Sequence, residues 1–137
     1  MEIVVIDGQG GRIGRSLIEG FKERLGDTVT ITAIGTNSIA TAGMIKAGAD
    51  NAATGENATL VACRKADIIV GPIGIVLADA LLGEITPSMA TAVAQSDAHR
   101  ILIPFQGCNT TIAGSSSLPL SELIQKAINE AIKIAEK

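Results

Sequence analysis

A cluster of glycines directly after a short, largely apolar run constrains this chain more than any other feature of its sequence. The run is residues 2–6, and the segment after it reads Asp7-Gly8-Gln9-Gly10-Gly11-Arg12-Ile13-Gly14. Such β-branched runs are typical of buried parallel strands, and the spacing of Leu17, Ile18 and Phe21 predicts a helix over residues 14–25. Glycines let a ligand approach the backbone, and a helix start offers unpaired N–H groups. This order of strand, loop and helix therefore predicts a phosphate-binding turn.

Strand-like and helix-like segments alternate along the rest of the chain. The further predicted strands are residues 28–34, 67–70 and 100–105, with a brief extended piece within 50–57 and a short last strand at 110–113. The further predicted helices are residues 38–47, 57–66, 75–82, 87–96 and a last one capped by Ser121. The alternation predicts an α/β fold with a mostly parallel, doubly wound, Rossmann-like sheet and helices on both faces. At 137 residues, one domain spanning residues 1–137 is expected.

Composition and charge exclude several classes of function. The net charge is −3, the pI is about 5.1 and aromatic residues make up 1%, so no surface for nucleic acid is expected. The longest apolar stretch, residues 68–78, is shorter than the roughly 20 residues of a membrane span, and the N-terminus shows no secretory signal. The two cysteines, Cys63 and Cys108, match no metal spacing and fit free thiols in a reducing compartment. We expect a cytoplasmic protein without a nucleic-acid partner, membrane partner or metal site.

The glycine loop matches the dinucleotide-binding fingerprint only in part. A strict G-x-G-x-x-G pattern from Gly8 needs its third glycine at position 13, where the chain has Ile13, and Gly14 comes one residue late. The acid that usually holds the ribose hydroxyls after strand two is absent, because that position reads Gly35-Thr36-Asn37-Ser38. Hydroxyl and amide groups there suit a phosphate, so NADP is favoured among the dinucleotides.

Two other interpretations of the loop stay open. The P-loop of ATP- and GTP-binding proteins needs glycine at position 9 and lysine at position 15, where this chain has Gln9 and Arg15. The glycines could instead serve only to pack the first helix on the sheet. The same choice applies to Gly71-Pro72-Ile73-Gly74, which either lets a ligand approach or forms a tight turn against a helix.

Ligands of doubly wound sheets bind outside the carboxyl ends of the strands. The residues expected to bind the phosphate-containing ligand are therefore Gly8, Gln9, Gly10, Gly11, Arg12, Ile13, Gly14, Thr36, Asn37, Ser38, Gly71, Pro72 and Gly74.

Three residues are candidates for catalysis. Asp7 ends the first strand, where its carboxylate repels phosphate unless a cation intervenes; it could recruit Mg²⁺, act as a base, or cap the loop through backbone amides. Glu56 is either an acid or base or part of a capping box, and the other loop acids, Glu84 among them, form no recognisable pair. Cys108 would need a base, and the single histidine, His99, lies roughly 20 Å away at the other end of the same predicted strand.

Several strings together resemble a family of small bacterial proteins known as domain of unknown function 3842. They are Val5-Ile6-Asp7-Gly8-Gln9-Gly10-Gly11, Gly35-Thr36-Asn37, Ala53-Thr54-Gly55-Glu56-Asn57, Gly71-Pro72-Ile73-Gly74, Leu82-Gly83-Glu84-Ile85-Thr86-Pro87 and Cys108-Asn109. The likeness extends from the N-terminus to about residue 114. It implies a Rossmann-like fold and a bacterial, cytoplasmic origin, and it supplies no activity and no catalytic residues for this chain.

Three functions remain compatible with the sequence. The first is a domain that binds a nucleotide or dinucleotide, with NADP favoured. The second is an enzyme whose site a second subunit completes, since the apolar content and the predicted helix 75–82 fit a homodimer or higher oligomer. The third is a structural or interaction module with a vestigial loop.

Overall fold

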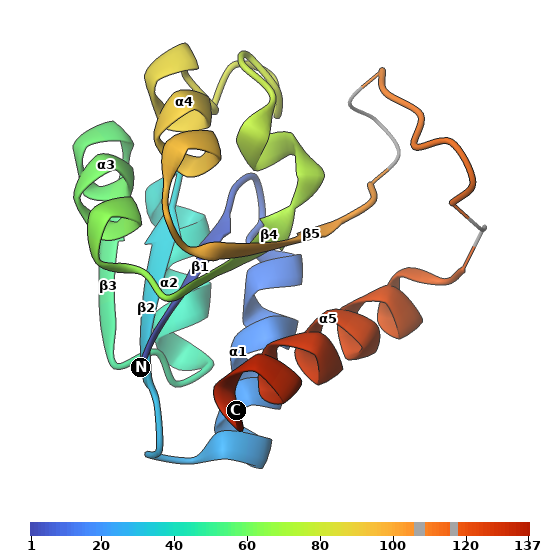
Figure 1. Cartoon of the computed structure of the whole chain (residues 1–137). Coiled ribbons are helices and arrows are strands. Elements are labelled where there is room, and N and C mark those ends of the chain that lie inside the picture. The colour runs from blue at the N-terminus through green and yellow to red at the C-terminus, as the bar shows by residue number, and fades with distance from the viewer. Residues whose placement is uncertain (106–108, 116–117) are drawn as a thin grey trace.

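The computed structural model describes residues 1–105, 109–115 and 118–137, which form a five-stranded sheet covered by helices on both faces (Figure 1). The strands are β1 (Glu2–Asp7), β2 (Thr30–Gly35), β3 (Asn51–Thr54), β4 (Ile68–Pro72) and β5 (His99–Ile103). The helices are α1 (Arg12–Leu25), α2 (Ser38–Lys46), α3 (Glu56–Lys65), α4 (Pro87–Gln95) and α5 (Leu120–Ala135), with a 3-10 turn, η1, at Ile73–Val76. The α/β class and the doubly wound sheet predicted from the sequence are confirmed.

The order of the strands places a crevice above the centre of the sheet. All neighbours pair in parallel in the order β3-β2-β1-β4-β5, so the chain moves outward from β1 to one edge and then returns to β4 on the other side. The connections after β1 and β4 therefore diverge, which is where ligands bind in such sheets. The register sets Asp7 beside Gly35 and Val5 beside Val70. The loops after β1, β2 and β4 therefore lie together at the carboxyl ends of the strands.

Alternation of side chains divides the core into two layers. In β1, Ile3 and Val5 face the layer of α1, α2 and α5, whereas Val4 and Ile6 face the layer of α3 and α4. Figure 1 shows α3 and α4 on one side of the sheet and α5 lying across α1 on the other. Because β1 is buried on both faces, its sequence is continuously apolar rather than alternating. None of the helices in the described residues is long and apolar enough to cross a membrane.

The predicted helix 75–82 is wrong. Only η1 forms there, and residues 77–84 follow as a series of turns in which Asp79, Leu81 and Leu82 have positive φ. The Asp79 amide donates to the Ile85 carbonyl over 2.7 Å and closes the segment on itself. Ile75, at the start of the predicted helix, is nonetheless used for packing, since it is fully buried, as is Ile85 just after the turns.

Smaller differences lie at the edge of the sheet and near the C-terminus. The brief extended piece expected within residues 50–57 is the edge strand β3, held in register by β2. Residues 110–113 form no strand. Ser121 does not cap α5, because the helix begins one residue earlier, at Leu120, and Pro119 is its N-cap residue.

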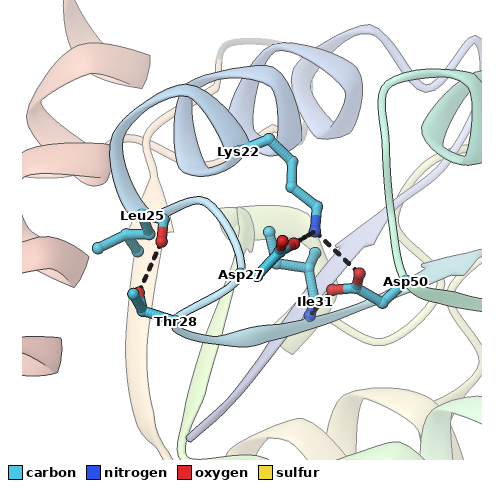
Figure 2. A network of polar contacts seen from close by, with 6 residues as sticks. All are labelled: Lys22, Leu25, Asp27, Thr28, Ile31 and Asp50. Atoms are coloured by element: carbon cyan, nitrogen blue, oxygen red, sulfur yellow. Dashed lines mark hydrogen bonds and ion pairs between the residues drawn. The ribbon is translucent and has the colours of Figure 1, made fainter.

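A polar network fixes the edge of the sheet opposite the crevice (Figure 2). Lys22 of α1 bonds to Asp50 over 2.8 Å, and the other oxygen of Asp50 accepts the Ile31 amide over 2.8 Å. The Lys22 hydrogen bond and the Ile31 amide lower the pKa of Asp50. Asp27 lies 3.9 Å from Lys22, and the Thr28 hydroxyl donates to the Leu25 carbonyl. The network thus ties the end of α1 to the starts of β2 and β3.

Candidate functional site

Asp7 organises the glycine loop from inside the protein. It is 5% exposed, and its two carboxylate oxygens accept the backbone amides of Gly8 over 2.8 Å and Gly14 over 2.7 Å. Burial raises the pKa of Asp7, although the backbone amides of Gly14, Gly8 and Ile13 act in the opposite direction. Asp7 therefore caps the start of α1, a place where a ligand phosphate would otherwise find the Gly14 amide.

Most glycines of the loop are required by internal packing. A Cβ on Gly8 would lie 2.5 Å from Thr36 Oγ1, and one on Gly11 would lie 2.8 Å from Ala40 Cα. A Cβ on Gly14 would meet Met44 and Asp7. Gly10 differs, because no atom lies within 4 Å of the place its Cβ would take. Close approach of a ligand is therefore possible at Gly10, while the other three glycines serve the fit of α1 and its neighbours.

A pocket with a volume of about 250 Å³ opens directly above this loop. The loop and the end of β4 line it together with apolar side chains from three later segments. The lining residues are Asp7, Gly8, Gln9, Gly10, Gly11, Arg12, Ile13, Pro72, Leu81, Phe105 and Leu120. Its position between β1 and β4 is the crevice that the strand order predicts.

Gly10 and Arg12 bring hydrogen-bond donors to the lining of this pocket. Within the described part of the chain, the backbone amides of Gly10 and Arg12 have no acceptor, and the Arg12 guanidinium has no ion pair. Arg12 is exposed at the start of α1 and lines the pocket. The loop therefore offers an anion two amides and one cation beside an apolar wall. Arg15, the residue at the P-loop lysine position, lies against Gly43 of α2 instead.

Thr36 and Asn37, expected to hold a ligand, bind a carboxylate of the protein itself. Glu84 Oε1 accepts Asn37 Nδ2 over 2.8 Å, the backbone amide of Gln9 over 2.9 Å and the Thr36 hydroxyl. Burial alone would raise the pKa of Glu84, but these hydrogen bonds outweigh it and lower the pKa. Ser38 is the exposed first residue of α2 and does not line the pocket.

The structure corrects the premise on which NADP was favoured. An acid does stand at the end of β2, but it comes from Glu84, 48 residues after Thr36 in the chain. No local pattern could reveal it, because the approach depends on the turns of residues 77–84. A 2′-phosphate at this position would face a carboxylate at close range, which is unfavourable.

The turn at the end of β4 contributes one residue to the pocket. Pro72 lines it, whereas Gly71 and Gly74 are buried and do not. A Cβ on Gly71 would collide with the Ile6 carbonyl of β1. Gly71 is therefore explained by the close approach of two strands.

The other candidate catalytic residues are not brought to the pocket. Glu56 is exposed at the start of α3, and its carboxylate accepts the Thr86 hydroxyl over 2.6 Å. Cys108 lies outside the described residues. Cys63 is a buried free thiol whose pKa is raised by burial to about 11, and His99 is exposed at the start of β5. No three His, Cys, Asp or Glu side chains of the described segments gather in a group that could hold a metal ion.

The sequence reasoning missed three lining residues of the pocket and the role of Glu84. Leu81, Phe105 and Leu120 form the apolar wall, and Glu84 joins the two loops. Phe105 had a usable signal, because it follows the last strand at the carboxyl edge. Leu81 had none, since it lies where the composition predicts a helix, and no local pattern indicates that the loop acid Glu84 bonds to Gln9, Thr36 and Asn37.

Comparison with known proteins places the chain in a family. The sequence model of the family described as Domain of unknown function (DUF3842) matches residues 2–136, so the chain belongs to that family and the resemblance seen in the sequence is confirmed. No curated protein matches the chain. Among solved structures, it is similar to a dodecameric FMN-dependent Ubix-like decarboxylase from Escherichia coli O157:H7, with 17% identity, coverage of 95% of this chain and 75% of that chain, and a TM-score of 0.47.

Proposed function

We propose that the chain binds a small phosphate-containing molecule of the nucleotide type in the pocket above the glycine loop. One observation carries the proposal: Gly10 and Arg12, whose backbone amides have no acceptor among the described residues, line the same pocket as the apolar side chains of Leu81, Phe105 and Leu120. Binding pockets combine an apolar lining with a few placed polar groups in this way. A ring system would contact the wall formed by Leu81, Phe105 and Leu120, and a phosphoryl group would lie at Gly10 and Arg12.

The size of the pocket favours a mononucleotide, or one half of a dinucleotide. Its volume of about 250 Å³ lies below the roughly 300–1,000 Å³ of pockets that enclose drug-sized ligands. While Glu84 is bonded to Thr36, its carboxylate also disfavours a phosphorylated ribose at the end of β2. We therefore retain the nucleotide-type ligand expected from the sequence. We expect it to carry an unphosphorylated ribose in preference to the ribose 2′-phosphate of NADP.

The electrostatics of the loop are compatible with an anion despite Asp7. Both of its oxygens are held by backbone amides, and burial raises its pKa, so the carboxyl is more easily protonated than an exposed aspartate. An approaching phosphate would raise this pKa further, because a nearby negative charge favours the neutral acid. Proton uptake by Asp7 on binding would then reduce the repulsion.

Thermal unfolding with a panel of ligands tests the proposal. The panel is AMP, ATP, FMN, NAD, NADP and inorganic phosphate, and a ligand at about 100 times its dissociation constant adds about 2.7 kcal/mol of stability, which is several degrees in a chain of this length. The shift is expected to shrink in Arg12→Gln and Gly10→Ala. Arg64→Gln, which changes an exposed arginine outside the pocket, is the matched control. The proposal would be contradicted if no ligand of the panel raised the unfolding temperature, or if the rise were the same in the Arg12 and Gly10 variants as in the wild type.

A second candidate function is catalysis with Asp7 as the acid or base. Asp7 lines the pocket, and a buried acid with a raised pKa beside a ligand site is a recognised mark of catalytic residues. Incubation with whichever nucleotide stabilises the protein, followed by ³¹P NMR, would show a new phosphorus species if a reaction occurs. An Asp7→Asn variant that still binds but gives no product would support catalysis, and unchanged turnover would remove Asp7 from it.

A further inference from the structure

Three donors from two separate loops converge on one oxygen of Glu84. The Gln9 amide and Asn37 Nδ2 lie 2.9 and 2.8 Å from Glu84 Oε1, which also accepts the Thr36 hydroxyl. The other oxygen of Glu84 accepts no hydrogen bond from the described residues. Three donors around one negatively charged oxygen are also what a phosphoryl or carboxyl group of a ligand requires.

The Asn37 side chain and the backbone of Thr36 are held in place by bonds that do not involve Glu84. Asn37 Oδ1 accepts the Ala40 amide over 2.9 Å as the cap of α2, and Asn37 Nδ2 also donates to the Gln9 carbonyl over 2.9 Å. The Thr36 amide donates to the Asp7 carbonyl over 3.0 Å. The arrangement would therefore persist if the carboxylate left, as a ready-made anion subsite must.

The segment that carries Glu84 is held in a strained conformation. Leu81 and Leu82 both have a φ of 56°, in the left-handed region that leucine avoids. Leu82 is 97% exposed, so its own packing does not hold it there. Such strain persists only where surrounding contacts impose it, and the three hydrogen bonds of Glu84 are among those contacts.

The same segment covers the first part of the glycine loop. At Gly8, Leu81 Cδ1 and Glu84 Oε1 lie 2.8 and 3.0 Å from the place a Cβ would take. Gly8, Gln9 and Gly10 all line the pocket, but the Gln9 amide is already bonded to Glu84, so a ligand there finds only the Gly10 amide open. Movement of Leu81 and Glu84 would join the pocket to the donors at Thr36 and Asn37.

We infer that the Gln9 amide, the Thr36 hydroxyl and the Asn37 side-chain amide form an anion subsite, which the Glu84 carboxylate fills until a second phosphoryl group of the ligand displaces it. The inference rests on the proposed function, which places the first phosphoryl group at Gly10 and Arg12. Gln9 and Gly10 are consecutive, with Cα atoms about 3.8 Å apart, so two linked phosphoryl groups can contact both subsites. The ligand class is thus a diphosphate ester, and residues 77–84 are its displaceable cover.

Titration calorimetry with inorganic pyrophosphate and inorganic phosphate tests the inference. A site filled by its own carboxylate binds a competitor with reduced apparent affinity, so Glu84→Ala should bind pyrophosphate roughly tenfold more tightly than the wild type. The affinity for phosphate, which needs only Gly10 and Arg12, should change less than about twofold. Glu2→Ala is the matched control, because Glu2 also accepts a threonine hydroxyl, that of Thr32, at the opposite edge of the sheet. Glu84→Gln, which keeps the size of the side chain, carries the same test if Glu84→Ala does not fold.

The outcomes separate this inference from the proposed function. Weaker or unchanged pyrophosphate binding by Glu84→Ala, with phosphate binding that still depends on Arg12, overturns the subsite and leaves the proposed function standing. Failure of every variant to bind either anion overturns both. Faster amide hydrogen exchange at residues 79–85 in wild-type protein saturated with pyrophosphate would show that the cover is displaced, and unchanged exchange would overturn the displacement.

Discussion

At the scale of single residues, Asp7 shows how a strand that ends in an acidic residue can be followed by a glycine loop. Its carboxylate does for the loop and for α1 what a ligand anion would do, and it does so in the absence of ligand. The sequence allowed this capping role beside a metal-binding and a catalytic role for Asp7. The hydrogen bonds to Gly8 and Gly14 support the first of the three, while the buried position in the pocket keeps the catalytic role as a proposal.

Asp7→Asn should lower the free energy of unfolding by about 1–3 kcal/mol. Asparagine presents an N–H₂ group to at least one of the two backbone amides, which leaves a buried donor unsatisfied. Urea unfolding at pH 7 measures the loss, and Asp97→Asn, at an exposed aspartate, should change stability by less than about 0.5 kcal/mol. Equal stability of the two variants would show that Asp7 does not hold the loop.

Replacing Gly8 or Gly10 by alanine should affect the stability of the protein differently. Gly8→Ala forces a Cβ to within 2.5 Å of Thr36 Oγ1 and 2.8 Å of Leu81 Cδ1, so a loss of about 1–3 kcal/mol is expected from overpacking. Gly10→Ala meets open space and should leave stability unchanged within about 0.5 kcal/mol. Denaturant unfolding of both variants checks this, and a large loss at Gly10 would mean that its freedom is needed by the fold and not by a ligand.

At the scale of elements, residues 77–84 separate what could be predicted from what could not. Buried strands, the cap and proline that begin α4, and the stripe of α5 were all readable, because each has a local period or a local start signal. The turn segment has an apolar composition that equally suits a helix. Its path is decided by Ile85 and by Glu84, which bond or pack with residues far away in the chain.

Leu82→Gly should stabilise the protein by about 0.5–1 kcal/mol. The left-handed φ of 56° costs leucine roughly 1–2 kcal/mol, glycine adopts it freely, and the greater freedom of the unfolded chain takes back part of the gain. No buried contact is lost, since Leu82 is 97% exposed. Ile39→Gly, at an exposed residue inside α2, should instead cost about 1 kcal/mol. A destabilised Leu82→Gly would contradict the strain assigned to this turn.

The contact between α1 and the starts of β2 and β3 should depend on pH through Asp50. The pKa of Asp50 in the folded protein is lowered below the ordinary 3.8. Its contribution to the free energy of unfolding is therefore complete above pH 3.8 and is lost as the pH falls through the lower, folded pKa. Asp50→Asn should therefore cost at most about 1 kcal/mol at pH 7, because solvent screens the pair at this exposed site, and nothing below the folded pKa. Asp27→Asn, on the same lysine but fully exposed, is the control in urea unfolding at several pH values. A pH-independent difference would contradict this assignment.

At the scale of the whole molecule, the strand order explains both the success and the limit of the site prediction. The alternation of elements places the loops after β1 and β4 at one crevice, so residues 8–13 and Pro72 could be assigned to a site from the sequence. The opposite wall comes from Leu81, Phe105 and Leu120, and only the three-dimensional path of the chain brings these together. For the same reason, the acid at the end of β2, which Glu84 supplies, could not be predicted from the sequence.

Binding of a nucleotide-type ligand at the glycine loop can be observed by titrating the ¹⁵N-labelled protein with AMP and following its amide NMR signals. We expect saturable shifts at the backbone amides of Gly10 and Arg12, with smaller changes at Leu81 and Leu120 along the apolar wall. Gly55, whose surroundings lie outside the pocket, should not move. Shifts confined to another surface, such as the groove of Leu60, Arg64 and Asp97 between α3 and α4, or no shifts at millimolar AMP, would contradict the claim that the glycine-loop pocket binds a nucleotide-type ligand.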